Sequence, residues 1–153
     1  MPDRSDLDRI LAANRYCVLG TADQAGTPWV TPVFFAPLDP DRLCWVSSPN
    51  SRHSQNIAGR STIAITVYDS TVPIGQAEAA YFDADATRTT SDSTEAALDA
   101  LNARLPSDKQ LSLSDLLPAG PMAVYQATVR RRYVLVRGGN PEFRNVLDLT
   151  LEV

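Results

Sequence analysis

The stretch that decides the fold of this chain runs from residue 45 to residue 57 and reads Trp45-Val46-Ser47-Ser48-Pro49-Asn50-Ser51-Arg52-His53-Ser54-Gln55-Asn56-Ile57. It follows an apolar strand pattern and leads into a short helix pattern. Free N–H groups at a helix start and serine hydroxyls suit an anion, and Arg52 can grip a phosphate through two parallel hydrogen bonds. Serine and asparagine are also the commonest helix caps and turn formers. The residues alone therefore leave two interpretations open, a phosphate-binding loop and an ordinary helix cap.

The composition is typical of one globular domain, which we expect to span residues 1–153. Hydrophobic residues make up 44% of the chain and charged residues 21%, enough apolar material for a core. A net charge of −4 argues against a nucleic-acid-binding protein, and the short basic run at 130–132 is typical of a solvated strand edge or turn. No stretch predicts a membrane span, and the N-terminus lacks the apolar core of a signal peptide, so we expect a cytoplasmic protein.

Strand patterns dominate the chain on both sides of this stretch. A helix is predicted over 5–14, with a capping box at 5–8, and apolar strands follow at 16–22, 29–35 and 43–47, which indicates an antiparallel meander. Pro32 lies inside the second strand and indicates a bulge or an unpaired N–H there. After a short helix at 54–58, capped by Gly59, strands are predicted at 62–68, 76–87, 123–130, 133–136 and 146–153, with a helix at 91–104 and one helical turn at 114–117. Short strands without βαβ units favour a closed or partly closed barrel.

Other chemistries have weaker signals. Cys17 and Cys44 lie inside strand patterns and are interpreted as buried thiols, and the spacing of cysteine and histidine predicts no metal site. A Ser-His-Asp hydrolase would have to use His53, but the Gly-x-Ser-x-Gly elbow is absent from the sequence. The carboxylates of Glu78, Asp83 and Asp85 are interpreted as solvated.

The order of helix, strand, glycine-containing turn, proline-containing strand, turn, strand and Ser51-Arg52-His53 resembles the pyridoxamine 5′-phosphate oxidase-like superfamily of FMN-binding split barrels. The similarity runs over about residues 7–87, and phrases such as 16–21, 28–35 and 72–75 resemble an actinobacterial branch of that superfamily. The resemblance implies a mainly β fold, a split β-barrel of antiparallel strands with short flanking helices. It also implies a homodimer with the flavin at the subunit boundary.

The resemblance implies a site for FMN, position by position. Ser51 and Arg52 match a Ser-Arg-Lys triplet that holds the phosphate, and His53 stands where that triplet has lysine. Ser47 and Ser48 match the hydroxyls at the strand end. The strand beneath the flavin ring is represented by Thr31, Pro32, Val33 and Phe34.

Two departures from the family separate this chain from a true pyridoxine phosphate oxidase. Thr31 stands where many such oxidases carry an arginine, and Phe143 and Arg144 do not reproduce the C-terminal Trp and Arg pattern that binds substrate. The resemblance therefore implies a flavin-dependent oxidoreductase for an unidentified small molecule, with no catalytic side chain identified. The alternatives are a non-catalytic flavin-binding or storage protein, and a split barrel that uses deazaflavin F420 or haem.

The aromatic side chains give one further expectation about assembly. An exposed half-barrel carrying Trp29, Phe34, Phe35 and Trp45 would leave a larger apolar patch than monomers usually tolerate. A two-fold symmetric dimer is the commonest way to cover such a patch.

Overall fold

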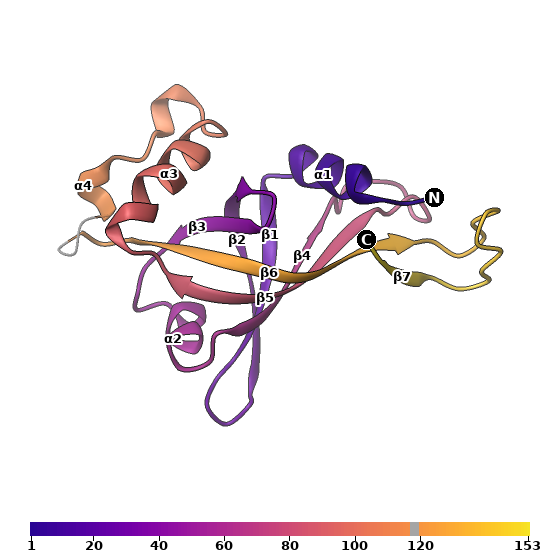
Figure 1. Cartoon of the computed structure of the whole chain (residues 1–153), viewed down its shortest axis with the longest axis horizontal. Helices are drawn as coiled ribbons and strands as arrows, with labels where there is room; N and C mark the ends of the chain where they lie inside the picture. Colours follow the sequence, from indigo (N-terminus) through magenta and orange to yellow (C-terminus); the bar gives the residue numbers. More distant parts are fainter. Residues whose placement is uncertain (117–119) are drawn as a thin grey trace.

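Six antiparallel strands close into a barrel in the computed structural model, which describes residues 1–116 and 120–153 (Figure 1). The strand order is β3-β2-β1-β4-β5-β6-β7, and a further pairing between β3 and β6 closes the barrel. The barrel strands are β1 (Tyr16–Ala22), β2 (Pro28–Asp39), β3 (Arg42–Ser47), β4 (Thr62–Tyr68), β5 (Ala79–Arg88) and β6 (Ala123–Val136). The short strand β7 (Leu149–Glu152) adds to β6 outside the barrel. The predicted split barrel and its N-terminal meander are confirmed.

The barrel core forms because alternate side chains of each strand point inward. Leu19 on β1, Phe35 on β2 and Trp45 on β3 are fully buried, and the Trp45 ring stacks on Tyr125 of β6 with ring centroids 6.1 Å apart. The expectation that Phe35 and Trp45 contribute to an exposed patch is therefore wrong. The strand period places both side chains on the inner face, which the barrel closes over.

The outer face of the sheet does carry exposed apolar side chains, but different ones. Tyr16 on β1, Val30 on β2 and Tyr68 on β4 are 62%, 67% and 47% exposed. Of the four predicted aromatics, Trp29 is 39% exposed and Phe34 is half-buried, with its ring edge against Tyr16.

Proline 32 is tolerated because β2 has a strand partner on only one side at that point. Residues 28–34 pair with β1, whereas pairing with β3 begins at Phe35. Phe35 donates its N–H to the carbonyl of Arg15, so the backbone groups of the odd-numbered residues of β2 face β1. Successive residues of a strand alternate in direction, so the backbone groups of Pro32 face away from β1. Of the two predicted alternatives, the unpaired N–H position is confirmed. The bulge in β2 lies further on, between Pro37 and Asp39.

β6 is one continuous strand where the sequence predicted two. Opposite β5 the register shifts, with Asp83 facing Arg131 and Ala84 facing Val129, which leaves Arg130 as the extra residue of a β-bulge. The charged run at 130–132 hid this continuity. Arg130 and Arg132 contact the carboxylates of Asp85 and Asp41, at 3.4 and 2.8 Å.

The helices α1 (Arg4–Ala13) and α2 (Arg52–Gly59) cover the barrel core, whereas α3 (Ser91–Asn102) and α4 (Leu113–Leu116) pack on the outer face of β2, β3 and β6. α1 begins one residue earlier than predicted, with Asp3 as its N-cap and a capping box formed by Asp3 and Asp6 rather than by residues 5–8. α2 lies against β1, β2 and β5 and includes Gly59, so Arg60 takes the predicted capping position. The 3₁₀ turn η1 (Ser107–Lys109) lies between α3 and α4 in the chain. Part of the predicted turn at 114–117 lies outside the described residues.

Arg104 joins the end of α3 to the barrel. Its guanidinium donates hydrogen bonds to the carbonyls of Phe35, Leu11 and Asn14, and it lies 4.7 Å from the centre of the Phe35 ring. These carbonyls belong to β2 and to the last turn and C-cap of α1, so one cation links three elements.

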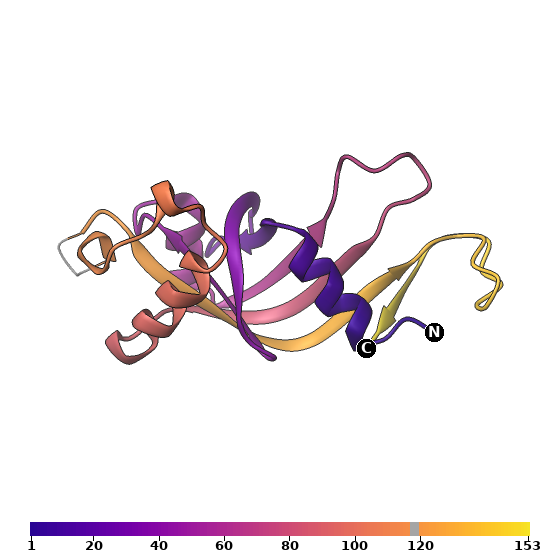
Figure 2. The same ribbon diagram turned by 90° about the horizontal axis from the view of Figure 1, so that it is seen from above.

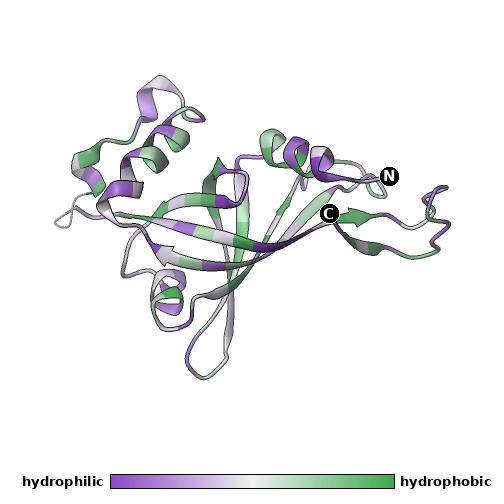
Figure 3. Cartoon of the chain, viewed as in Figure 1, coloured by the Kyte–Doolittle hydropathy of each residue, from purple (hydrophilic) through white to green (hydrophobic). Residues whose placement is uncertain are grey.

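Two segments project from the end of the barrel opposite α3 and α4 (Figure 2). They are the loop at 69–78 and the connection between β6 and β7, at 137–148. Apolar residues line the paired ends of β6 and β7 (Figure 3), and Val146 and Leu147 in the connection are 89% and 78% exposed. Within the described ranges, none of the helices has the length and apolar character needed to cross a membrane.

Candidate functional site

The serine-rich stretch forms the connection between β3 and α2, as predicted, and Ser51 is the N-cap of α2. The Ser51 hydroxyl accepts a hydrogen bond from the N–H of Ser54. Ser48 shapes the turn, since its carbonyl accepts from the Ser51 N–H at 3.1 Å and its hydroxyl accepts from the Asn50 N–H. The helix-cap interpretation is therefore confirmed for Ser51, and it leaves the rest of the connection to be explained.

A compact polar network joins the two ends of this connection. The Nε2 atom of His53 lies 2.7 Å from the Ser47 hydroxyl and 3.3 Å from the Ser51 hydroxyl. The Ser51 hydroxyl also has the Ser54 hydroxyl and the Ser48 carbonyl within 2.8 Å. Ser47 and Ser54 are buried, and burial lowers the pKa of His53 below its usual value of 6.5. The network therefore holds a neutral imidazole at neutral pH.

Arg52 is a cation in this region that is available to bind an anion. Its guanidinium lies 4.2 Å from the centre of the Trp29 ring on β2, and among the described residues no carboxylate pairs with it. The backbone N–H groups of Arg52 and His53, the first two of α2, also lack an acceptor within that part of the chain. An exposed guanidinium beside two free N–H groups at a helix start is an arrangement suited to an anion.

The residues predicted to lie under a ring divide between the two faces of β2. Thr31 pairs with Leu19 and Val33 with Cys17, so these two side chains point to the inner face, and Val33 is buried. Pro32 and Phe34 point outward. Only the backbone edge of β2 and the outward side chains are therefore available to a ligand at 31–34.

A cavity of about 410 Å³ lies on the outer face of the barrel, next to this edge. No motif in the sequence indicated this cavity, although the alternation in each strand shows which side chains could line it. They come from five barrel strands and β7 and include Val18, Gly20, Val30, Thr66, Tyr81 and Tyr133. Gly20 has no side chain, and a Cβ there would make ordinary van der Waals contact with the Ala64 carbonyl oxygen, 3.6 Å away.

The unpaired edge of β2 lies between this cavity and Arg52. The Trp29 side chain lies on the inner face of β2, and its ring contacts the Arg52 guanidinium. The side chain of the next residue, Val30, lines the cavity on the outer face. A ligand held by Arg52 can therefore run along the edge of β2 toward the outer face.

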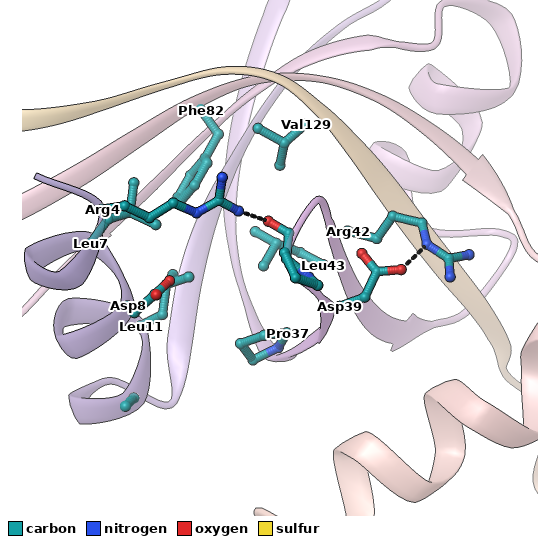
Figure 4. Close-up of a pocket in the computed structure, with 12 residues that line it drawn as sticks. Arg4, Leu7, Asp8, Leu11, Pro37, Asp39, Arg42, Leu43, Phe82 and Val129 are labelled. Carbon is teal, nitrogen blue, oxygen red and sulfur yellow. Dashed lines mark hydrogen bonds and ion pairs between the residues drawn. The ribbon is translucent and has the colours of Figure 1, made fainter. Parts of the chain in front are cut away.

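A second cavity, of about 400 Å³, lies between α1 and the turn that joins β2 to β3 (Figure 4). Its walls are apolar, with Leu7, Leu43 and Phe82 from the core, while the side chain of Arg4 reaches across to the carbonyl of Pro40. None of the predicted site residues lines it. Arg42, at its rim, pairs with Asp39 at 2.7 Å.

The arrangement gives little support to hydrolysis or metal chemistry. Ser47 and His53 are within hydrogen-bond reach, but no described carboxylate contacts the imidazole to orient it as in a Ser-His-Asp triad. Among the described residues, no three histidine, cysteine, aspartate or glutamate side chains gather as metal ligands. Cys17 and Cys44 are buried free thiols, as predicted, and burial raises the pKa of each to about 12.

The carboxylates that were interpreted as solvated contact separate side chains in the structure. Glu78 pairs with Arg9 at 2.8 Å, and Asp83 accepts a hydrogen bond from the Tyr133 hydroxyl at 3.3 Å. They form no acid–base pair.

Comparison with known proteins agrees with the split-barrel fold. A family model described as pyridoxamine 5′-phosphate oxidase matches residues 5–133. No curated protein matches the chain.

Similar solved structures carry different names. A candidate 5-nitroimidazole antibiotic resistance protein from Bacteroides thetaiotaomicron is 21% identical with a TM-score of 0.73, over 88% of this chain and 84% of that one. The haem storage protein HutZ from Vibrio cholerae is 16% identical with a TM-score of 0.69, over 85% and 92%. A FAD-binding protein from Mesorhizobium loti is 16% identical with a TM-score of 0.65, over 87% and 94%. At these identities the likeness shows the fold alone.

Proposed function

Since the chain belongs to the pyridoxamine 5′-phosphate oxidase family, we propose that it binds FMN and acts as a flavin-dependent oxidoreductase on a small molecule. The observation that carries the proposal is the free Arg52 guanidinium on Trp29, at the N-terminus of α2 and at the start of the unpaired edge of β2. Such a place suits a ligand with a phosphate at one end and a flat polar ring at the other.

The phosphate lies at the start of α2 in this proposal. Arg52 supplies two parallel donors, and the N–H groups of Arg52 and His53 supply two more. The hydroxyls of Ser47, Ser48 and Ser51 surround them and are shared with the His53 network. Because His53 is neutral where the family has lysine, the phosphate here depends on Arg52 more than on a second cation.

The ring lies along β2 at 31–34 in this proposal, with backbone groups as its polar partners. The cofactor supplies the redox chemistry, and the protein positions it and sets its electrostatic surroundings. Thr31 has no charge to hold a substrate phosphate, and Phe143 and Arg144 lie in the projecting connection between β6 and β7. We expect no turnover of pyridoxine phosphate.

The proposal includes a homodimer. Tyr16, Val30 and Tyr68 expose apolar surface on the outer face of three neighbouring strands, and Val30 also lines the 410 Å³ cavity. A second copy that covers this face would enclose the ring and complete the site, as expected for a flavin at a subunit boundary.

Haem is the second candidate, because the haem storage protein HutZ shares the fold. An axial ligand would have to come from a group such as His53 or Tyr81. The Nε2 atom of His53 already contacts Ser47 at 2.7 Å, and burial, with the charge of Asp148, raises the pKa of Tyr81, which disfavours a phenolate ligand. FMN fits the described side chains better.

Titration of the purified protein with FMN and with riboflavin tests the proposal. We expect bound FMN to lose its fluorescence with a dissociation constant of about 1 μM or below. Riboflavin, which lacks the phosphate, should bind at least tenfold more weakly, an estimate from about one lost charge-assisted hydrogen bond. Equal affinities would contradict the phosphate site. Binding of hemin with an intense Soret band, and no response to FMN, would favour the haem candidate.

A second measurement separates an enzyme from a storage protein. Anaerobic mixing of the FMN-loaded protein with NADH or NADPH should bleach the flavin absorbance, and air should restore it over repeated cycles. Tight stoichiometric binding without reduction by either nicotinamide or by reduced F420 would favour storage.

A further inference from the structure

The unpaired edge of β2 offers an unusual ratio of backbone acceptors to donors. Phe35 hydrogen-bonds to Arg15, and the register with β1 is unbroken from residue 28 to residue 34. The odd-numbered residues of this segment therefore direct their backbone groups to β1, and the even-numbered ones direct theirs to the free edge. Residues 28, 30 and 32 thus present three carbonyls. The N–H of Phe34, the next even-numbered residue, faces the same side beside the first pair of β2 with β3.

From residue 28 to residue 32 only one N–H accompanies these three carbonyls, because two of the three residues are prolines. Pro28 and Pro32 have no backbone N–H, so Val30 supplies the single donor of this stretch. Among the described residues, no strand pairs with β2 on this side before Phe35, so the Val30 N–H and the carbonyls of Pro28, Val30 and Pro32 have no ladder partner there. A strand without prolines would present three donors and three acceptors at the same edge.

We infer that this acceptor-rich edge selects the reduced form of the bound flavin over the oxidised form. The inference rests on the proposed function, which puts the ring at this edge. Oxidised flavin has one ring N–H and several ring acceptors. Reduction by two electrons adds hydrogen at N5 and so turns an acceptor into a donor. An edge rich in carbonyls therefore gains hydrogen bonds when the ring is reduced, whereas an edge with more N–H groups would lose them.

Edge prolines also have a structural role, because they prevent pairing with the edge of another sheet. That role concerns association between chains and does not depend on the redox state of a ligand. The ratio of the affinities for reduced and oxidised flavin therefore distinguishes a role of Pro28 and Pro32 in flavin binding from their role in preventing association between chains.

Pro32→Ala tests the inference because it restores an N–H that faces the free edge. We expect the affinity for reduced FMN relative to oxidised FMN to fall about tenfold, which corresponds to a midpoint potential about 30 mV more negative for a two-electron couple. Val30→Pro removes the last donor of the stretch and should shift the ratio in the opposite direction. Potentials are measured by anaerobic dithionite titration against a reference dye.

Pro37→Ala is the matched control. It makes the same chemical change in the same strand, where residue 37 pairs with Leu43 of β3, beyond the unpaired segment. This control should leave the ratio unchanged. Thermal unfolding of each variant shows whether it folds, and Pro28→Ala replaces Pro32→Ala if that protein does not fold.

The failures of the two ideas are distinguishable. If FMN does not bind to the wild-type protein, the proposed function is wrong. If FMN binds with the expected dependence on Arg52, but neither Pro32→Ala nor Val30→Pro changes the ratio, the inference about the edge is wrong. An equal shift in Pro37→Ala would also overturn it, because the effect would then belong to strand stiffness and not to the edge donors.

Discussion

Replacement of Arg52 by alanine should weaken FMN binding by about 10- to 150-fold. The structure gives the basis of the estimate. The guanidinium has no carboxylate partner among the described residues and is held only by the face of Trp29, 4.2 Å away. Truncation therefore removes one charge-assisted contact to phosphate, worth about 1.5–3 kcal/mol. The cation–π contact adds about 0.5–1 kcal/mol, but it exists with and without ligand and so cancels to first order.

Two further variants sharpen this test. Arg52→Lys should recover only part of the affinity, because an ammonium group cannot form two parallel hydrogen bonds or stack on Trp29 in the same way. Arg60→Ala is the matched control, since it removes the same charge from the other end of α2, where the Arg60 guanidinium donates to the Gln24 carbonyl. It should change the affinity by less than about twofold, a long-range effect that salt screens.

The assay is quenching of FMN fluorescence at 50 and 300 mM salt, with riboflavin as the phosphate-free ligand. Arg52→Ala should reduce the preference for FMN over riboflavin and leave riboflavin binding almost unchanged. Wild-type affinity for FMN in Arg52→Ala would show that the connection between β3 and α2 is only a helix cap. A loss shared equally by FMN and riboflavin would show that Arg52 acts on the ring region and not on the phosphate.

Four other measurements test the structure and the proposed function. Burial lowers the pKa of His53, so the unfolded chain takes up the proton at a higher pH than the folded chain. The urea midpoint of unfolding should therefore decline below about pH 6.5. His53→Gln should remove this part of the decline. His53→Lys should tighten FMN binding above neutral pH, because it adds a full charge beside the phosphate, and unchanged binding would contradict this. Arg104→Ala should lower the free energy of unfolding by about 2–3 kcal/mol, since three carbonyls lose a charged donor, and Arg104→Lys should recover part of this loss. A loss below about 0.5 kcal/mol in urea unfolding would show that water replaces the guanidinium. Light scattering at low micromolar concentration should give twice the chain mass of 16.7 kDa, and a monomer would remove the shared flavin site.

The sequence predicted the barrel because its local signals agree with the tertiary structure. The strands at 16–22 and 62–68 have one buried face, so their alternation survives in the sequence and their bounds are those of β1 and β4. β6 was split because its bulge places Arg130 and its neighbours in the middle of the strand, and a charged run is a poor sign of a strand. The partners that neutralise it, Asp41 and Asp85, are distant in sequence.

For the candidate site, the sequence indicated fewer of the structural features than it did for the fold. The loop at 47–53 was located, since hydroxyls and an arginine before a helix are visible in sequence. The contact of Arg52 with Trp29 could not be predicted, because it depends on how the hairpin of β1 and β2 lies against α2. The cavity on the outer face was missed because it is assembled from single outward residues of several strands, and each of these looks like an ordinary surface position.

The pairing of β3 with β6 has a consequence for the order of folding. Residues 42–47 meet residues 123–128, so this ladder closes a much longer chain loop than the hairpins of β1, β2 and β3 do. We therefore expect the N-terminal meander to form early and the β3–β6 ladder late, with slow folding overall. Ser47, which holds His53, is itself paired with Ala123 in that ladder. A nascent chain that ends before residue 123 would thus lack the finished form of the proposed anion site. The proposed cofactor could then bind only after nearly the whole chain has left the ribosome.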